Sequence, residues 1–236
     1  MGSEFFSRSA ALLGEAAMAR LKSAHVAVIG VGGVGSWCAE ALVRTGLGKI
    51  TLVDDDTVAA SNVNRQCPAL AATIGRAKVE AMRERLLAIN PDCEVAARCV
   101  RFETFEACEW LEECDSIVDA IDSVDCKAEL VLGATAAKVP LVSSMGAALR
   151  LDPTKVRVTQ FEKVEGDGLA RALRQRFKRL GRFPKTKFTC VWSGERPVSN
   201  TEARRHGGEC GKGSVMTVTA TFGMCLAREV MRCLGS

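Results

Sequence analysis

The sequence predicts an α/β protein with a Rossmann-like, doubly wound, mainly parallel sheet and an irregular C-terminal lobe. Three observations favour this fold class. Short apolar runs alternate with segments of helical periodicity, the first apolar run leads directly into the glycine-rich segment 30–35, and the alternation breaks down beyond about residue 150. With 236 residues, of which 47% are hydrophobic and 25% charged, the chain has enough apolar material for one large domain.

The N-terminal elements form a strand–helix–strand unit. A short helix over 12–21 precedes the apolar run 25–29, which suits a strand buried on both faces. After the glycine-rich segment, a helix is expected over 36–45 and a second strand over 49–53. Such a unit almost always crosses over right-handedly into a parallel sheet.

The later elements continue the alternation. Further helices are expected over 78–90, 105–113 and 126–138, and strand-like runs over 94–100, 116–121, 139–143 and 155–161. We therefore expect a single domain over 1–236, with a basic and flexible lobe inserted over 164–213. The glycine-rich end of that lobe suits either a lid or a plain flexible loop.

Composition excludes several classes of protein. The 11 cysteines contain no CxxC pair, which argues against a disulfide scaffold and against zinc and indicates reduced thiols in the cytoplasm. In a eukaryotic host an organelle would be equally compatible, because residues 1–5 resemble a cloning scar that would hide a targeting sequence. The longest apolar stretch, 215–226, is too short to span a membrane.

The glycine-rich segment predicts a nucleotide site. Gly30, Gly32 and Gly35 fit GxGxxG between a strand and a helix, a spacing that brings backbone N–H groups close to a phosphate. Asp54, at the end of the second strand, is placed to accept hydrogen bonds from ribose hydroxyls. This pattern alone does not distinguish NAD from ATP.

Charged residues after the second strand favour ATP. Arg65 and Lys78 would neutralise the charge that develops on pyrophosphate when the bond between the α and β phosphates breaks, whereas hydride transfer has little use for them. Asp122 follows the strand-like run 116–121 and could hold a magnesium ion. Taken singly, Arg65 or Lys78 would be an ordinary surface charge.

The inserted lobe carries a cluster of positive charge. Eight basic residues and no acidic residue occur within 17 positions: Arg171, Arg174, Arg176, Lys178, Arg179, Arg182, Lys185 and Lys187. Phenylalanines are interleaved with them. A solvated amphipathic helix would explain the pattern, but it also matches the surface that contacts a nucleic-acid backbone.

Cys190 follows this cluster. A thiolate nucleophile needs an electropositive setting, which Lys185 and Lys187 could supply, whereas most cysteines in such a chain serve packing. We keep Cys190 as a candidate reactive thiol beside that alternative.

Five segments together resemble the ubiquitin-activating-enzyme-like adenylyltransferases. They are GVGGVG (30–35), Asp54 with Asp56, SNVNRQ (61–66), GRAK (75–78) and DAIDS (119–123). FSR (6–8), DPTKVRVT (152–159) and TVTATFG (217–223) resemble the branch of that family that dehydrates N6-threonylcarbamoyladenosine in tRNA. The similarity covers nearly the whole chain.

The resemblance implies roles for individual residues. ATP would be bound by Gly30, Gly32, Gly33, Gly35, Asp54, Asp56, Asn64, Arg65, Lys78 and Asp122. Arg8, Arg65, Lys78 and Asp122 would be catalytic, with magnesium held by Asp122. Arg8 would be lent to the ATP site of a second subunit, which implies a homodimer. The CxxC pairs with which sulfur-carrier activators hold zinc are absent from the sequence.

The implied reaction is ATP-dependent dehydration of the modified adenosine beside the anticodon. The threonyl carboxylate is adenylated with release of pyrophosphate, and ring closure then releases AMP. An activator of a ubiquitin-like or sulfur-carrier protein is the alternative, and a non-catalytic nucleotide-binding module or an NAD enzyme is a third hypothesis. Docking of a sulfur-transfer partner protein is left open.

Overall fold

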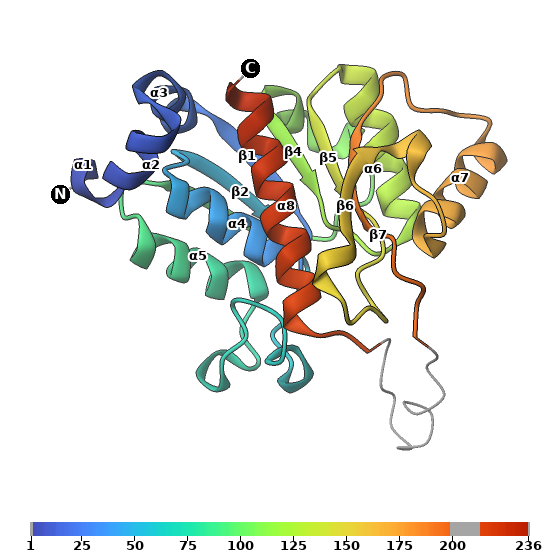
Figure 1. Ribbon diagram of the computed structural model, residues 1–236, viewed down its shortest axis with the longest axis horizontal. Coiled ribbons are helices and arrows are strands. Elements are labelled where there is room, and N and C mark those ends of the chain that lie inside the picture. Colours follow the sequence, from blue (N-terminus) through green and yellow to red (C-terminus); the bar gives the residue numbers. More distant parts are fainter. Residues whose placement is uncertain (1, 199–212, 236) are drawn as a thin grey trace.

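The computed structural model describes residues 2–198 and 213–235 and contains a seven-stranded sheet (Figure 1). The strand order is β3-β2-β1-β4-β5-β7-β6. The strands are β1 (His25–Ile29), β2 (Lys49–Val53), β3 (Glu94–Arg98), β4 (Ser116–Asp119), β5 (Leu141–Ser144), β6 (Val156–Gln160) and β7 (Thr189–Ser193). Among the described strands of this sheet, neighbours pair in parallel except β6 and β7, which pair antiparallel. The predicted Rossmann-like sheet is confirmed.

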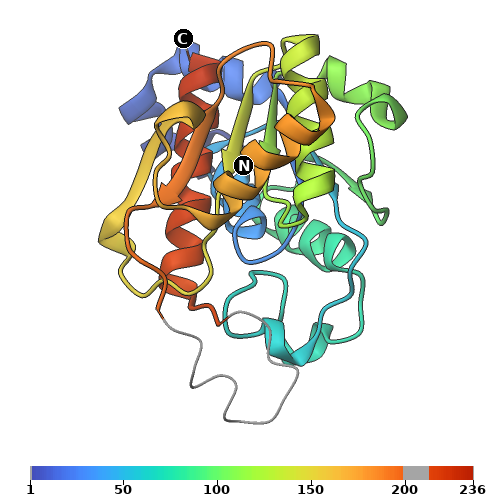
Figure 2. The same ribbon diagram turned by 90° about the vertical axis from the view of Figure 1, so that its right-hand side faces the viewer.

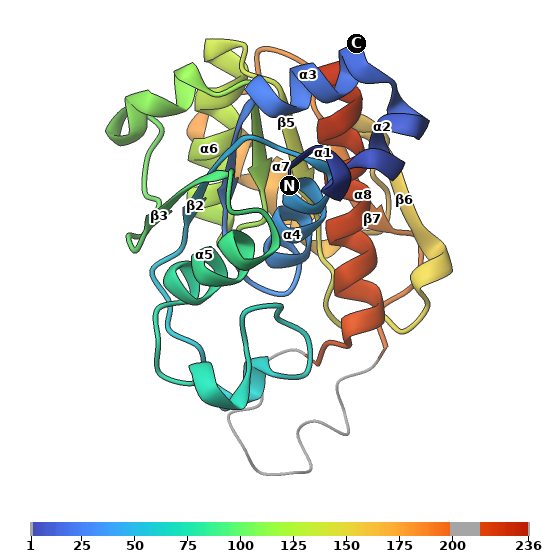
Figure 3. The ribbon, with the colours of Figure 1, turned by 90° about the vertical axis from the view of Figure 1, so that its left-hand side faces the viewer.

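Helices cover both faces of the sheet. They are α1 (Gly2–Phe5), α2 (Ser7–Leu13), α3 (Glu15–Ser23), α4 (Gly35–Thr45), α5 (Lys78–Ile89), α6 (Val124–Ala137), α7 (Gly168–Leu180) and α8 (Met216–Gly235). Figure 3 faces the side with α4, α5 and α8, and Figure 2 shows α6 and α7 on the opposite side. Side chains alternate along β1, so that Val26 and Val28 pack in one core and Ala27 and Ile29 in the other.

A glycine in the long helix α8, Gly223, packs against the start of α4. A Cβ atom at Gly223 would lie 2.6 Å from the carbonyl oxygen of Val34 and 2.8 Å from Cβ of Trp37. Such distances leave no room for a side chain. The helices therefore approach each other closely where the glycine-rich loop enters α4.

The C-terminal part is more regular than the sequence indicated. The expected lobe at 164–213 contains α7 and also β7, a fully buried strand between β5 and β6. The run TCVWS, rich in β-branched and aromatic residues, is short enough to be overlooked beside the basic helix. The part of the expected lid over 199–212 lies outside the described residues.

Two smaller expectations also differ. The predicted helix over 12–21 is divided at Gly14, whose φ of 82° interrupts α2 and α3. The predicted helix over 105–113 is a 3₁₀ segment, Glu106–Glu113, interrupted at Cys108. Within the described residues, no helix combines the length and the apolarity that crossing a membrane requires.

The side chain of Glu40 connects α4 with α5 and with Cys67. Its carboxylate accepts hydrogen bonds from Arg85 of α5 and Arg44, and from the thiol of Cys67 at 2.7 Å. Burial would raise the pKa of Glu40, but these donors outweigh burial and lower it from 4.5 to about 2. Burial, and then the contact with Glu40, raise the pKa of Cys67 to about 12.

We expect Glu40→Gln to destabilise the protein near neutral pH by about 2–3 kcal/mol. Because the folded-state pKa lies below the ordinary value, the stabilisation is complete above about pH 4.5 and is lost as the pH falls toward 2. Denaturant unfolding of both proteins between pH 7 and pH 3 measures the difference in stability, which should narrow below about pH 4.5. Glu84→Gln, which removes an exposed partner of Arg76, is the control. An equal loss at all pH values would contradict the charge-based account.

Candidate active site

The glycine-rich loop lies at the carboxyl ends of β1 and β4, where the strand order reverses. Gly30 has a φ of 93°, and a Cβ there would lie 2.7 Å from the carbonyl oxygen of Ala120, directly after β4. In the part of the chain that the structure describes, the amides of Gly32, Gly33 and Val34 donate no hydrogen bond. These N–H groups at the start of α4 are therefore open to an anion.

Asp54 ties the end of β2 to this loop. Its carboxylate accepts hydrogen bonds from the backbone amides of Val31 (2.7 Å) and Asp56 (2.9 Å). Burial raises the pKa of Asp54, and the charge of Lys78 opposes that shift. Asp54 is thus beside the loop, as the ribose-binding prediction requires.

Lys78 is the first residue of α5 and is buried. Its Nζ lies 2.6 Å from Oδ2 of Asp56 and 3.9 Å from Oδ1 of Asp54. The structure therefore brings three predicted residues, Asp54, Asp56 and Lys78, into one ion-pair group next to the glycine loop.

Arg65 lies against the loop from the other side. A Cβ at Gly33 would be 3.2 Å from Cγ of Arg65, so the arginine side chain runs along the loop. Its Nη1 donates to the carbonyl of Ser61 and to Oδ1 of Asn64, while Nε and Nη2 make no hydrogen bond within the described residues. Asn64 also donates to the carbonyl of Ser214, just before α8.

Asp122 is exposed on the segment that follows β4. It has no hydrogen bond or ion pair within the described residues, so its carboxylate is available to a ligand. The carboxylate that lies within β4 itself, Asp119, is buried and paired with Lys127 at 2.6 Å. The two acidic residues of DAIDS therefore have different environments.

The donor set fits a nucleotide with its phosphates and a hard cation. Unpaired amides and two basic side chains from separate segments surround the loop, and carboxylate oxygens are the ligands that magnesium prefers. Asp54, Asp55 and Asp56 also place one oxygen each within 4.8 Å of one another. If magnesium is present, the exposed carboxylate of Asp122 is available to hold it, and the ion would neutralise phosphate charge.

Arg8 does not reach this loop in its own chain. It is exposed on α2, and its neighbour Phe6 lies 3.5 Å from the position of a Cβ at Gly46, just past the end of α4. The glycine loop lies at the other end of α4, a helix about 16 Å long. A role for Arg8 in a neighbouring subunit stays a prediction.

The basic cluster lies on α7 and the segment after it. Three of its members have partners: Arg174 donates to the carbonyls of Phe161 and Val164, Arg176 pairs with Asp125, and Arg182 pairs with Glu129. Five exposed side chains form no ion pair in the described residues. These five, named here the open cations, are Arg171, Lys178, Arg179, Lys185 and Lys187.

Cys190 has a packing environment. It is fully buried in β7, and burial raises the pKa of its thiol well above the ordinary value, with the charge of Lys127 acting in the opposite direction. A protonated, inaccessible thiol is a poor nucleophile. The structure gives no support to the candidate reactive thiol at this position.

Two residues at the site were missed by sequence reasoning. Gln66 is buried with its Nε2 3.9 Å from the Cβ position of Gly32, and its Oε1 has no hydrogen-bond partner among the described residues. It belongs to the same SNVNRQ segment, which was the available signal. Lys127 lies inside an apolar helical pattern, and nothing in the sequence names its partner Asp119.

Comparison with known proteins agrees with this site. The fold and the loop with its basic side chains define a nucleotide-binding α/β protein. The ThiF family model matches residues 6–236, and the chain belongs to the ThiF family. It is 39% identical over 246 residues to the tRNA threonylcarbamoyladenosine dehydratase of Escherichia coli (strain K12), covering 96% of this chain and 92% of that protein.

Two further similarities bear on function. The crystal structure of the E. coli tRNA N6-threonylcarbamoyladenosine dehydratase in complex with ATP matches with a TM-score of 0.89 and 38% identity, covering 98% of this chain and 94% of that chain. The molybdopterin-synthase adenylyltransferase of E. coli is 36% identical over 174 residues, covering 74% of this chain and 66% of that protein.

Proposed function

We propose that this chain is an ATP-dependent dehydratase of N6-threonylcarbamoyladenosine in tRNA. The observation that carries the proposal is a complete phosphate-binding loop, flanked by Arg65 and Lys78, in a chain that is similar over 96% of its length to a dehydratase of that name. The alternative, an activator of a carrier protein, is less favoured because similarity to molybdopterin-synthase adenylyltransferase covers only 74% of the chain.

The reaction has two steps. The threonyl carboxylate attacks the α-phosphate of ATP, forming an acyl-adenylate and displacing pyrophosphate, whose charge Arg65 and Lys78 stabilise. The ureido group of the same modification then attacks the activated carbonyl and displaces AMP, so that a ring closes with net loss of water. Because both reacting groups belong to one side chain, good orientation can contribute about 7–11 kcal/mol without a protein nucleophile.

Other parts of the proposal concern assembly. Magnesium held by Asp122 would neutralise phosphate charge, and Arg8 of a second copy would complete the ATP site in a homodimer. Cys38, Cys93 and Cys190, among other described cysteines, are free thiols, which fits the cytoplasm. A sulfur-transfer partner protein would be an additional contact that the reaction itself does not need.

The decisive experiment supplies the protein with ATP and magnesium together with unmodified or threonylcarbamoylated tRNA. We expect AMP release only with the modified tRNA, together with a nucleoside lighter by one water in mass spectrometry. Turnover with a carrier protein bearing a Gly-Gly tail, and none with the modified tRNA, would favour the alternative. No pyrophosphate exchange with any substrate would indicate a non-catalytic nucleotide-binding module.

The open cations on α7 should bind the tRNA backbone. Changing Arg171, Lys178 and Arg179 together to Gln should weaken binding of every tRNA sequence and lower the slope of log K against log salt by about 2–3. Gln substitutions of Lys22, Lys49 and Lys155, which lie on other elements, remove the same charge and serve as the control. If both triple variants had equal slopes, α7 would not be the tRNA surface.

A further inference from the structure

A pocket at the end of α7 has aromatic walls and a basic rim. It has a volume of about 350 Å³ and is lined by Phe161, Phe177, Phe183 and Phe188, with Lys178, Lys185 and Lys187 around them. The rings of Phe161 and Phe188 stack with centroids 4.9 Å apart. Since these two rings are buried, they form a rigid floor, and we name this hollow the Phe183 pocket.

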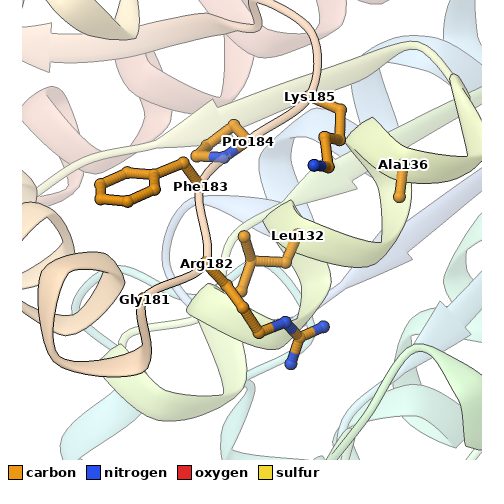
Figure 4. A pocket seen from close by; sticks show the side chains of 7 residues that line it. All are labelled: Leu132, Ala136, Gly181, Arg182, Phe183, Pro184 and Lys185. Carbon is orange, nitrogen blue, oxygen red and sulfur yellow. The ribbon is translucent and has the colours of Figure 1, made fainter.

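Phe183 is the exposed wall of this pocket. It is 57% exposed, although the other three phenylalanines are buried. It stands between Gly181, which ends α7 with a φ of 62°, and Pro184, which restricts the backbone. Figure 4 shows its ring projecting from the 181–185 segment, away from Leu132 and Ala136 of α6. More than half of the surface of this aromatic residue is therefore open to a ligand.

The positive charge around the pocket indicates that it suits an anionic ligand. Lys178, Lys185 and Lys187 are exposed and form no ion pair in the described residues, and Glu162 is the one acidic residue in the lining. An aromatic face beside free ammonium groups suits a nucleobase and its phosphates, because every base has a π face and its backbone is anionic.

Helix α7 connects the pocket to the active-site edge of the sheet. Its first turn is capped by Asp167, which also accepts a hydrogen bond from the amide of Gly146 just after the carboxyl end of β5. Its other end leads to Lys185, whose amide donates to Thr135 near the end of α6. The helix is about 20 Å long, so one RNA lying along its open cations could reach both ends.

We propose that the Phe183 pocket binds an unpaired nucleobase of the tRNA substrate, stacked on Phe183, with neighbouring phosphates at Lys178 and Lys187. The proposal rests on the proposed function, since it assumes that tRNA is the substrate. It assigns to this pocket a contact at the end of α7 that lies away from the active-site edge of the sheet, and this contact would therefore act on tRNA affinity and leave the chemical step unchanged.

Substitutions of Phe183 test the stacking. Phe183→Ala and Phe183→Leu should raise the Kd and KM for threonylcarbamoylated tRNA about five- to hundredfold, with kcat unchanged, whereas Phe183→Trp should retain wild-type values. Leucine is the sharper test, because it keeps apolar area and loses only the ring. Val100→Ala, a similarly exposed apolar side chain beyond β3 at the opposite edge of the sheet, is the matched control.

Salt dependence distinguishes the ring from the charges. Phe183→Leu should weaken binding without changing the slope of log K against log salt, whereas Lys187→Gln should lower that slope by about one. Unchanged Kd and KM in both Phe183→Ala and Phe183→Leu, with active wild-type protein, would overturn the nucleobase proposal. Wild-type protein that releases no AMP with threonylcarbamoylated tRNA would instead overturn the proposed function. Binding of an acidic peptide that depends on Phe183, with tRNA affinity unaffected, would assign the pocket to a protein partner.

Discussion

Arg65→Ala should lower kcat/KM for AMP release by about 10²–10³-fold while leaving the protein folded. The guanidinium runs along the glycine loop, and its Nε and Nη2 have no acceptor in the described residues. In the proposed reaction these donors meet the charge that develops on pyrophosphate. Removing them withdraws stabilisation that is strongest in the transition state.

The stability of the variant should change little. Within the described part of the chain, the side chain makes hydrogen bonds only with the backbone carbonyl of Ser61 and with Asn64, both at exposed positions. The contact that fixes this segment to α4 is the hydrogen bond from Nε1 of Trp37 to the backbone carbonyl of Arg65 at 2.9 Å, and alanine retains that carbonyl. Thermal unfolding and AMP release, measured on the same preparation, separate the two effects.

Two further variants make the result interpretable. Arg65→Lys keeps the charge but loses the planar fork, so it should recover part of the activity. Arg76→Ala removes an arginine from the neighbouring GRAK segment, where its partner is the exposed Glu84, and should leave the rate near that of wild type. If Arg65→Ala and Arg76→Ala had equal rates, the loop would not be the site of phosphate chemistry.

The site could be predicted in part because its pattern is local. GxGxxG, the acidic residue after β2 and the start of α5 are each defined by neighbouring residues, and strand ends in a parallel sheet meet at one edge. The contact of Arg65 with Gly33 follows from that geometry. The role of Arg8 could not be derived in this way, because Arg8 is predicted to act at the ATP site of another subunit. The sequence of one chain does not show how far Arg8 would lie from that site.

Contacts between side chains of different helices and strands were beyond sequence reasoning. Glu40 with Arg85 and Lys127 with Asp119 become neighbours only when helices pack on the sheet. For the same reason, the sequence did not predict that Cys190 is buried in the strand β7. The positive charge of the region led to the prediction of a surface lobe over 164–213. The structure instead buries β7, which belongs to that range, between β5 and β6.

The buried pair has a structural consequence for the site. Nζ of Lys127 donates to Oδ2 of Asp119 (2.6 Å), to the carbonyl of Ser144 (3.0 Å) and to Oγ of Ser143 (3.4 Å). Oδ1 of Asp119 accepts from the amide of Ile121, one residue before Asp122. The pair therefore joins α6, β4 and β5 at the base of the segment that presents Asp122.

Lys127→Met should destabilise the protein by about 3–5 kcal/mol, which corresponds to a fall in Tm of roughly 6–20 °C for a domain of this size. The loss of stability would arise from Asp119, which would no longer have a positively charged partner. The carboxylate of Asp119 is fully buried and would keep only Ser143 and the amide of Ile121 as donors. Denaturant unfolding with a constant m value measures the loss.

The double variant Lys127→Met with Asp119→Asn decides whether the unpaired charge causes that loss. Asparagine can still accept from the amide of Ile121 and leaves no buried charge, so most of the stability should return. If the double variant were as unstable as Lys127→Met, the loss would come from packing around α6 and the electrostatic account would be wrong. A single variant within about 1 kcal/mol of wild type would show that Asp119 does not need its partner.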